Sequence, residues 1–515
     1  MGQLDTKQDV KVNKKLDENA AILDRELGVG KSYDVIRKDI DVAGKKGVLY
    51  FVDGFAKDDI MLWILQTLAK VEKEDLTVNP LQKLTTKYIN YIETDVSDQL
   101  DKIIIAVLSG SIALFIDGIE QGIIIDAREY PSRGPQEPDI ERVSRGSRDG
   151  FVETLVFNSA LIRRRIRDPK LRMEILQVGR RSNTDVIISF IEDIANPDLV
   201  AQIKEKLQII NIDGLPMAEK SVEELIVPGS YWNPFPKVRY TERPDVAAVH
   251  LLEGHILLIV DTSPSIIILP TTYFHHVQHA EEYRQNPSIG VYLRWVRFFG
   301  IISSLFILPL WYLVSMQPEL LPEGLQYLGP EKTGNVPLLV QIILVEIGID
   351  LIRMAAIHTP SPLATALGLI AAFLIGDVAI TIGLFAPEVI LYGALAAVGT
   401  FATPSFELGL ANRYIRYVLL FSVAIFGFPG FLGGLTAVFL FLAFMKSYGI
   451  PYLWPLIPLD WRALKTILVR SPVPIQNIRP EILKPIDKSR QKGGTIPFPA
   501  KKPKLKWKKK KEDSE

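Results

Sequence analysis

Three ionisable residues lie inside a stretch that is otherwise apolar enough to cross a bilayer. Residues 336–357 contain Glu346, Asp350 and Arg353 among mostly hydrophobic side chains. On an α-helix, which turns 100° per residue, the three fall within an arc of about 60° and form one charged stripe. Facing lipid, each charge would cost roughly 2.5–3.5 kcal/mol. The stripe therefore has to face protein or water, which predicts either an ion pathway or charge pairing between helices or subunits.

The next apolar segment adds a third acid to this region. Residues 362–385 contain Asp377 and follow a short turn, so the two segments should be antiparallel neighbours. Equal distances from the turn place Asp377 at the depth of residues 344–346. Three acids and one arginine leave an excess of negative charge, which a cation pathway could use. Alternatively, one of the other acids pairs with Arg353 and holds helices together without any ion passing. Both interpretations stay open at this point.

The helices that must position these residues are predicted by length, since a crossing helix needs about 20 apolar residues. Four candidates lie in the second half of the chain: 298–317, 336–357, 362–385 and 387–403. A fifth apolar block, 417–446, is interrupted by the helix breakers Pro429, Gly430, Gly433 and Gly434. Such residues at membrane depth are typical of a hinge or of two half-helices. We expect an in-and-back hairpin that is broken near Pro429.

Charges beside these segments predict their orientation. Arg294 and Arg297 precede the first candidate, and Arg413 and Arg416 end a predicted loop, 404–416, after the fourth. The excess of basic residues in cytoplasmic loops places both positions in the cytoplasm, together with the first half of the chain. The hairpin then returns the carboxyl-terminal tail to the same side.

The first half of the chain contains an internal repeat. Residues 33–129 and 172–270 share the order strand, helix, helix and strand hairpin. The hairpins, 109–128 and 253–272, are each two apolar strands around a turn that begins with aspartate. We predict an α+β membrane protein: two tandem α/β cytoplasmic subdomains, then an α-helical transmembrane domain of four spans plus a broken helical hairpin. The expected boundaries are 1–130 for subdomain 1, 131–150 for a linker, 151–290 for subdomain 2, 291–460 for the transmembrane domain and 461–515 for a basic tail.

Composition excludes several classes of function. The 515 residues include 59 basic and 59 acidic side chains and no cysteine. The balanced charge gives no argument for nucleic acid, and the lack of cysteine excludes disulfides and thiol catalysis. The sequence GVGKS at 28–32 resembles part of a phosphate-binding loop, but Arg25 stands where the first glycine of that motif belongs. We expect no enzyme activity and no cofactor.

Two clusters of basic residues and the lysine-rich tail are interpreted without a catalytic or metal-binding role. His275, His276 and His279 are expected on a solvated helix surface, without the further ligands that a metal site needs. The arginines at 163–167 are expected at a solvated or membrane-facing edge or at a neighbouring subunit. Residues 501–511 contain eight lysines. This Lys501–Lys511 tail is predicted to be disordered and held near anionic lipid, at roughly 1 kcal/mol per lysine.

Several long motifs resemble a known family. They are PGSYWNPFPKVRYTERPDVAAVHLLEGHILLIVDTSPSIIILP (228–270), LRWVRFFG (293–300), VEIGIDLIRMAAIHTPSP (345–362), TPSFELGLANRYIR (403–416) and YGIPYLWPL (448–456). Together with LIGDVAI (374–380), they resemble the A subunits of GerA-type spore germinant receptors over nearly the whole chain.

The resemblance implies a multi-pass protein of the spore inner membrane, with the amino-terminal domain and the tail in the cytoplasm. It also implies ring-like homo-oligomers, pentamers in this family, that release monovalent cations during germination. The branch of the family that lacks a long low-complexity amino-terminal segment is expected to act with a small membrane partner and to amplify the receptor response. Because an oligomer is expected, the charged stripe is expected to lie on or beside a pore. A non-conducting scaffold that clusters receptors and a solute transporter remain alternatives.

Overall fold

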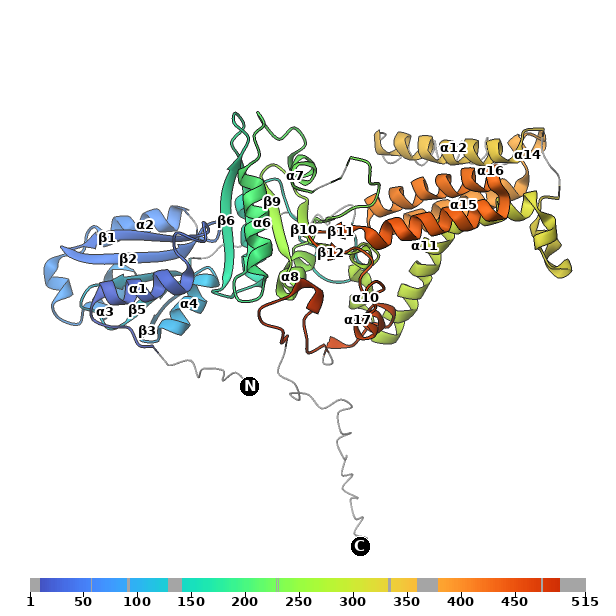
Figure 1. Cartoon of the computed structure of the whole chain (residues 1–515). Coiled ribbons are helices and arrows are strands. Elements are labelled where there is room, and N and C mark those ends of the chain that lie inside the picture. Colours follow the sequence, from blue (N-terminus) through green and yellow to red (C-terminus); the bar gives the residue numbers. More distant parts are fainter. Residues whose placement is uncertain are drawn as a thin grey trace, which may run out of the picture.

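The computed structural model describes most of the chain as two sheet-containing units and a helical bundle in a row (Figure 1). The described residues are 10–56, 58–89, 93–127, 141–227, 229, 231–331, 335–358, 378–473 and 476–490. Four predicted features fall outside them: Asp377, most of the candidate span 362–385, the first half of the linker and the Lys501–Lys511 tail.

Subdomain 1 is built on a five-stranded antiparallel sheet with the strand order β1-β2-β4-β5-β3. Its strands are β1 (Val35–Val42), β2 (Lys45–Val52), β3 (Thr94–Ser97), β4 (Ile112–Ile116) and β5 (Gly122–Ile125). Its helices are α1 (Leu16–Leu27), α2 (Asp58–Leu68), η1 (Lys73–Leu76), α3 (Pro80–Lys83), η2 (Leu84–Tyr88) and α4 (Leu100–Leu108). Both faces of the sheet are covered by apolar side chains, which form two separate clusters.

Subdomain 2 repeats this topology, with the strand order β6-β7-β9-β10-β8. Its strands are β6 (Leu171–Val178), β7 (Thr184–Ile191), β8 (Arg239–Thr241), β9 (Ile256–Val260) and β10 (Ile266–Leu269). Its helices are α5 (Leu155–Arg165), α6 (Pro197–Gln208), α7 (Ala218–Ile226), α8 (Pro244–Glu253), α9 (Tyr273–His276) and α10 (Ala280–Arg284). The matching strand orders agree with the internal repeat in the sequence.

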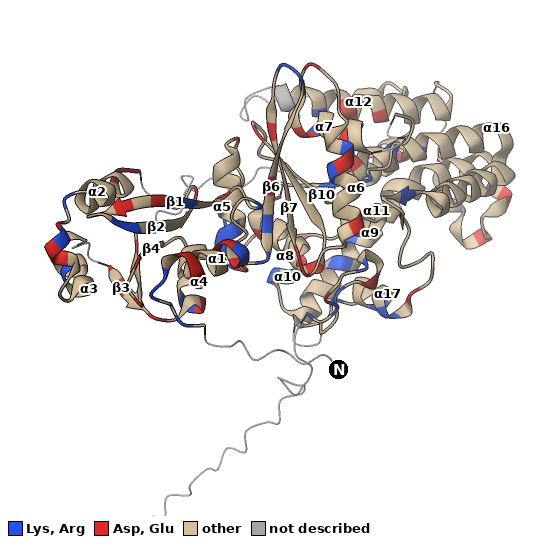
Figure 2. Ribbon diagram, turned by 60° about the vertical axis from the view of Figure 1, so that its left-hand side comes forward, with Lys and Arg blue, Asp and Glu red and all other residues tan. Residues whose placement is uncertain are grey.

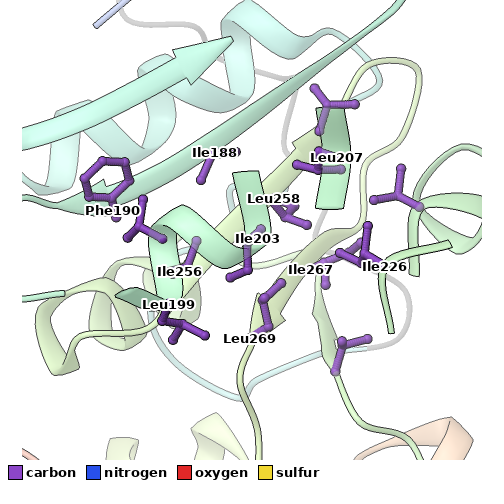
Figure 3. Packing of buried hydrophobic residues seen from close by; sticks show 14 of the residues in the cluster. Ile188, Phe190, Leu199, Ile203, Leu207, Ile226, Ile256, Leu258, Ile267 and Leu269 are labelled. Carbon is purple, nitrogen blue, oxygen red and sulfur yellow. The ribbon is translucent and has the colours of Figure 1, made fainter. Parts of the chain in front are cut away.

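The sheet of subdomain 2 is buried on both faces because successive residues of a strand point to opposite sides. Ile188 of β7 and Leu258 of β9 pack against Ile203 of α6 on one face (Figure 3). Ile187 and Leu257, their sequence neighbours, belong to the cluster on the other face, which is covered by α5 and α8. This double burial explains why the three central strands, β7, β9 and β10, consist mostly of isoleucine, leucine and valine.

The first arginine of the run after residue 162, Arg163, joins the two subdomains, whereas Arg164 and Arg167 are exposed. Arg163 Nε lies 2.9 Å from Asp34 Oδ2, and both side chains are 1% exposed. Arg163 also donates to the carbonyl of Leu171 at 3.2 Å, while Arg165 pairs with Asp149 at 2.9 Å. The predicted solvated or membrane-facing edge is therefore wrong for Arg163, since this side chain bonds to Asp34 across the boundary between the two subdomains.

The last part of the chain forms the helical bundle. Its elements are α11 (Pro287–Met316), η3 (Pro318–Leu320), η4 (Glu323–Leu328), α12 (Leu338–His358), α14 (Ala379–Thr381), α15 (Pro387–Phe401) and α16 (Phe406–Phe444), followed by β11 (Lys446–Ser447), β12 (Ile450–Pro451), α17 (Trp461–Leu468) and η7 (Glu481–Leu483). Figure 2 shows that few charged residues lie along these long helices, in contrast to the two subdomains.

Among the described residues, α11 and α16 are the two helices long and apolar enough to cross a membrane by length and composition. The 21 residues of α12 include the three charges of the stripe, and α15 has only 15 residues. The arrangement of four spans is therefore not confirmed.

The helix α16 is a hairpin of two arms, 406–426 and 428–444, that meet at Gly427. Gly427 has non-helical backbone angles of φ 61° and ψ −138°. The hydroxyl of Ser422 donates to the carbonyl of Gly430 at 2.7 Å, although eight residues of a straight helix would span about 12 Å. A Cβ atom on Gly434 would lie 3.1 Å from Leu419 Cδ2. The break predicted near Pro429 thus lies two residues earlier, and Pro429 occupies the first turn of the second arm, where proline is tolerated.

The hairpin returns the chain to subdomain 2. Asn233 Nδ2 lies 2.9 Å from Met445 Sδ, and the hydroxyl of Ser447 donates to the carbonyl of Lys237 at 2.8 Å. Where the chain enters the bundle, Arg294 in the first turns of α11 pairs with Glu282 of α10 at 2.6 Å, with both side chains buried. The first and the last helix of the bundle are therefore both attached to the same subdomain.

The glycines of the hairpin allow a matched test of this packing. A Cβ atom on Gly430 would overlap the carbonyl oxygen of Ser422, whereas one on Gly433 would have no described atom within 4 Å. We expect Gly430→Val to lower the melting temperature of the detergent-solubilised protein and its yield in membranes, at a cost of about 1–3 kcal/mol for overpacking. Gly433→Val, three residues away in the same arm, should leave both unchanged. Equal effects of the two substitutions would contradict the hairpin.

Candidate functional site

The charged stripe of α12 faces the neighbouring helices, and the opposite side of the helix is apolar. Glu346 is 2% exposed, whereas Leu344 and Leu351 on the outer side are 46% and 56% exposed. This orientation agrees with the expectation that the stripe avoids lipid, since the outer side presents only hydrocarbon. The site is therefore built between helices of the same chain.

Glu346 forms the innermost ion pair. Its carboxylate is paired with Arg416 of the first arm of α16, and the two side chains are 2% and 0% exposed. Arg416 also donates to the backbone carbonyl of Ser304 in α11. One guanidinium thus connects α16 to both α11 and α12. Removing one partner of such a buried pair costs about 3–5 kcal/mol, because it leaves a charge without compensation.

Asp350, one turn further along α12, forms a second and more accessible group. Its carboxylate lies 3.2 Å from Arg353 of the same helix and is also paired with Arg413 of α16. The guanidinium of Arg353 lies 5.4 Å from the centre of the Phe406 ring, a cation–π contact at the start of α16. The side chains of Asp350 and Arg353 remain 26% and 20% exposed.

Within the described residues this cluster contains two carboxylates and three guanidinium groups. The predicted excess of acids is therefore wrong for this part of the chain. Arg413 and Arg416 were expected in a loop, but they lie in α16 and face α12. Asp377 lies outside the described residues, so its membership of the cluster stays a prediction. Arg353 pairs with Asp350 of its own helix, and pairing between subunits stays a prediction.

The cluster still has unused hydrogen-bonding capacity. Among the described residues, Glu346 Oε1 and the Nε atoms of Arg353, Arg413 and Arg416 are buried without a hydrogen-bond partner. Buried polar groups in native proteins are normally paired with protein or water. The cluster is thus polar enough to bind water or an ion as well as to hold helices together.

Sequence reasoning missed the two arginines of α16 because it placed 404–416 in a loop. A signal for the helix was present: Ser405 is a favoured N-cap residue, and its hydroxyl accepts from the backbone N–H of Leu408 at 3.3 Å. A helix that starts at residue 406 carries Arg413 and Arg416 at a spacing of three, which places them on one face.

A second polar group, a cluster of histidines, lies where subdomain 2 meets the bundle. The ring centres of His250 and His255 are 5.0 Å apart, and that of His275 lies 5.0 Å from His255. His255 Nδ1 donates to the carbonyl of Pro270 at 2.9 Å, and His276 is 1% exposed. The predicted solvated surface is therefore wrong for His275 and His276. The described residues include no group of three His, Asp or Glu side chains arranged to hold a metal ion.

Burial keeps these rings neutral. It lowers the pKa of His255 to about 4 and that of His279 to about 4, and the nearby charge of Arg239 acts in the same direction. Burial also lowers the pKa of His250 and of His275 well below the usual value for histidine. Protonation would place several positive charges beside Arg239 in a space without solvent.

Comparison with known proteins connects this architecture to a family. The model for the Bacillus/Clostridium GerA spore germination protein family matches residues 22–482. The chain belongs to the GerA family. The match extends from α1 in subdomain 1 to η7 after the bundle, so both subdomains and the charge cluster lie within the GerA region.

Individual GerA relatives match over most of their length. Stage V sporulation protein AF of Bacillus subtilis is 49% identical over 474 residues, which cover 92% of this chain and 96% of that protein. Spore germination protein GerLA of Bacillus cereus is 31% identical, over 89% of this chain and 94% of its own. The crystal structure of the N-terminal domain of the A subunit of the Bacillus megaterium spore germinant receptor GerK3 is 27% identical, covers 52% of this chain and 99% of its own, and aligns with a TM-score of 0.42.

The buried pair between α12 and α16 predicts a non-additive mutational effect. Glu346→Leu or Arg416→Met alone should destabilise the protein by about 3–5 kcal/mol, whereas the double variant should regain most of that loss. The measurement is the melting temperature and the monodisperse yield of each variant in detergent. Additive losses in the double variant would show that the two side chains are not coupled.

The histidine cluster predicts instability in mild acid. The folded state excludes protons that the unfolded chain binds below pH about 6.5, so stability is complete above that pH and falls as the pH decreases toward 4. For His255 alone the loss at pH 5 is about 2 kcal/mol. Melting temperatures of the wild-type protein and of His255→Gln between pH 7.5 and 5 measure this. The variant should lose less stability than the wild type over that range, and identical losses would contradict the assignment.

Proposed function

We propose that this chain is a subunit of an oligomeric ion channel in the spore inner membrane, which conducts monovalent cations during germination and amplifies the response of the germinant receptors. The names of the relatives support a role in spore germination. Two apolar helices of sufficient length support a place in a membrane. Ion conduction, the homo-oligomer and its small membrane partner are our proposal.

The observation that supports conduction is the difference between the two ion pairs of α12. Glu346 and Arg416 are fully buried and connect three helices, which suits a fixed structural pair. Asp350 and Arg353 carry charge, retain partial exposure and lie at the edge of the cluster. We assign the structural role to the first pair and contact with passing ions to the second. Asp377 is proposed as a further member of the path.

An oligomer would complete such a path. The outer side of α12 is apolar, and so is much of the second arm of α16, where Phe439, Leu440 and Phe444 are exposed. Helices of this kind bury their outer sides against lipid or against another copy of the chain. A ring of copies, pentameric by the family resemblance, would bring one Asp350–Arg353 pair from each subunit toward a common axis.

A non-conducting scaffold is the second candidate. The observation in its favour is that each carboxylate of the described cluster already has an arginine partner in the same chain. The buried Arg163–Asp34 pair fixes the two subdomains to each other, which suits a platform that holds receptors together.

Ion flux from proteoliposomes distinguishes the two candidates. Purified protein, alone and with the small membrane partner, is compared with Asp350→Asn and with the double variant Glu346→Leu, Arg416→Met. We expect release of potassium ions by the wild type, a several-fold fall or a change in cation-over-anion selectivity in Asp350→Asn, and normal flux in the double variant. Normal flux in Asp350→Asn would place the path elsewhere. An absence of flux from every form, with receptor clustering intact in spores, would favour the scaffold.

A further inference from the structure

The segment that follows the bundle presents an unusual surface of apolar and basic side chains. Leu456, Leu459 and Trp461 are 40%, 54% and 72% exposed. Leu456 and Leu459 precede α17, Trp461 begins it, and its inner side packs through Leu464 and Ile467. Its outer side carries Arg462 and Lys465, both exposed. The lone acid of this stretch, Asp460, serves as the N-cap of α17 and accepts from the backbone N–H of Arg462 at 3.0 Å.

The position of this surface is fixed relative to the bundle. Arg294 of α11 donates to the carbonyls of Thr466 and Ile467 at 3.0 and 2.6 Å, at the carboxyl end of α17. Arg294 precedes Phe298, the start of the apolar stretch of α11, by four residues, or about 6 Å along the helix. Figure 1 shows α17 beside the end of α11 that lies next to subdomain 2. The segment therefore lies level with the point where the bundle becomes apolar.

Exposed aromatic side chains of α11 lie at the same level. Tyr292, Trp295 and Phe299 are 67%, 52% and 72% exposed. Tyrosine and tryptophan gather at the boundary between the membrane and water, because their amphipathic rings suit the headgroup region. Residues 456–469 therefore lie at the same depth along the bundle as these aromatic side chains. Its mixture of Trp, Leu, Lys and Arg is the composition of helices that lie in the plane of the interface.

We propose that residues 456–469 form a surface anchor that lies in the headgroup region of the membrane and binds anionic phospholipid. Trp461 and Leu459 enter the boundary between headgroups and acyl chains, while Arg462 and Lys465 pair with lipid phosphates. This contact is separate from that expected for the Lys501–Lys511 tail, because it belongs to a folded element attached to α11. The level and the basic charge favour lipid over a second copy of the chain, which would bring like charges together.

The lack of native cysteine makes a labelling test direct. Leu459→Cys carries a bimane label in full-length protein reconstituted into phosphatidylcholine vesicles with or without phosphatidylglycerol. Val78→Cys, in subdomain 1 and 65% exposed, is the control position. We expect the label at 459 to be quenched by doxyl-labelled lipid and shielded from iodide, and the label at 78 to behave in the opposite way. Quenching by iodide at 459 would overturn the proposal. Shielding from both quenchers would also overturn it and would identify a protein contact instead.

The charge requirement is tested separately. Arg462→Gln combined with Lys465→Gln should shift the label at 459 away from lipid, by about fivefold in the local equilibrium per charge removed, only in vesicles with phosphatidylglycerol. Arg180→Gln combined with Arg181→Gln removes the same charge from an exposed turn between β6 and β7 and should have no effect. The tail is unchanged in both variants. Equal behaviour of the two double variants would contradict the binding of anionic lipid by α17.

Discussion

The buried pair between Glu346 and Arg416 is the constraint on which the arrangement of the bundle depends. Neither charge is tolerable in an apolar layer alone, so α12 and α16 must meet at this level. The contact of Arg416 with the carbonyl of Ser304 adds α11 to the same point. Gly399 of α15 packs so closely on α11 that a Cβ atom there would overlap the carbonyl of Gly300. One ion pair therefore sets which helices are neighbours, and small residues set how near they approach.

Buried pairs of an arginine and a carboxylate also lie at the other boundaries between the units of the chain. Arg163 pairs with Asp34 between the two subdomains, and Arg294 pairs with Glu282 between subdomain 2 and α11. Arg163, Arg294 and Arg416 are among the largest fully buried side chains in the described structure. A buried ion pair contributes little net stability but is costly to break, so such pairs specify one relative placement of the units rather than strengthen each unit.

Local patterns in the sequence predicted the features that depend on local physics. The repeat of strands and helices, the inward direction of the stripe on α12 and a break close to Pro429 all follow from periodicity or from helix-breaking residues. The partners of the charges did not follow, because an arginine near the end of an apolar run is equally consistent with a loop and with a buried pair. Arg294, Arg413 and Arg416 were all taken as loop charges, yet each is buried in an ion pair. The histidines were misjudged for a similar reason, since their burial depends on how α8, the start of β9 and α9 pack on one another, which local periodicity does not show.

The attachment of both ends of the bundle to subdomain 2 has a mechanical consequence. The chain enters the bundle through Arg294 and Glu282 and leaves it through Met445 and Ser447, which contact Asn233 and Lys237. The helices thus form a closed loop whose two ends share subdomain 2 as their base. A rotation of that base displaces α11 and the second arm of α16 at the same time, while the turn at Gly427 stays at the far end. Torque applied to the sheets would therefore reach the far side of the bundle as a change in helix tilt rather than as a separation of helices.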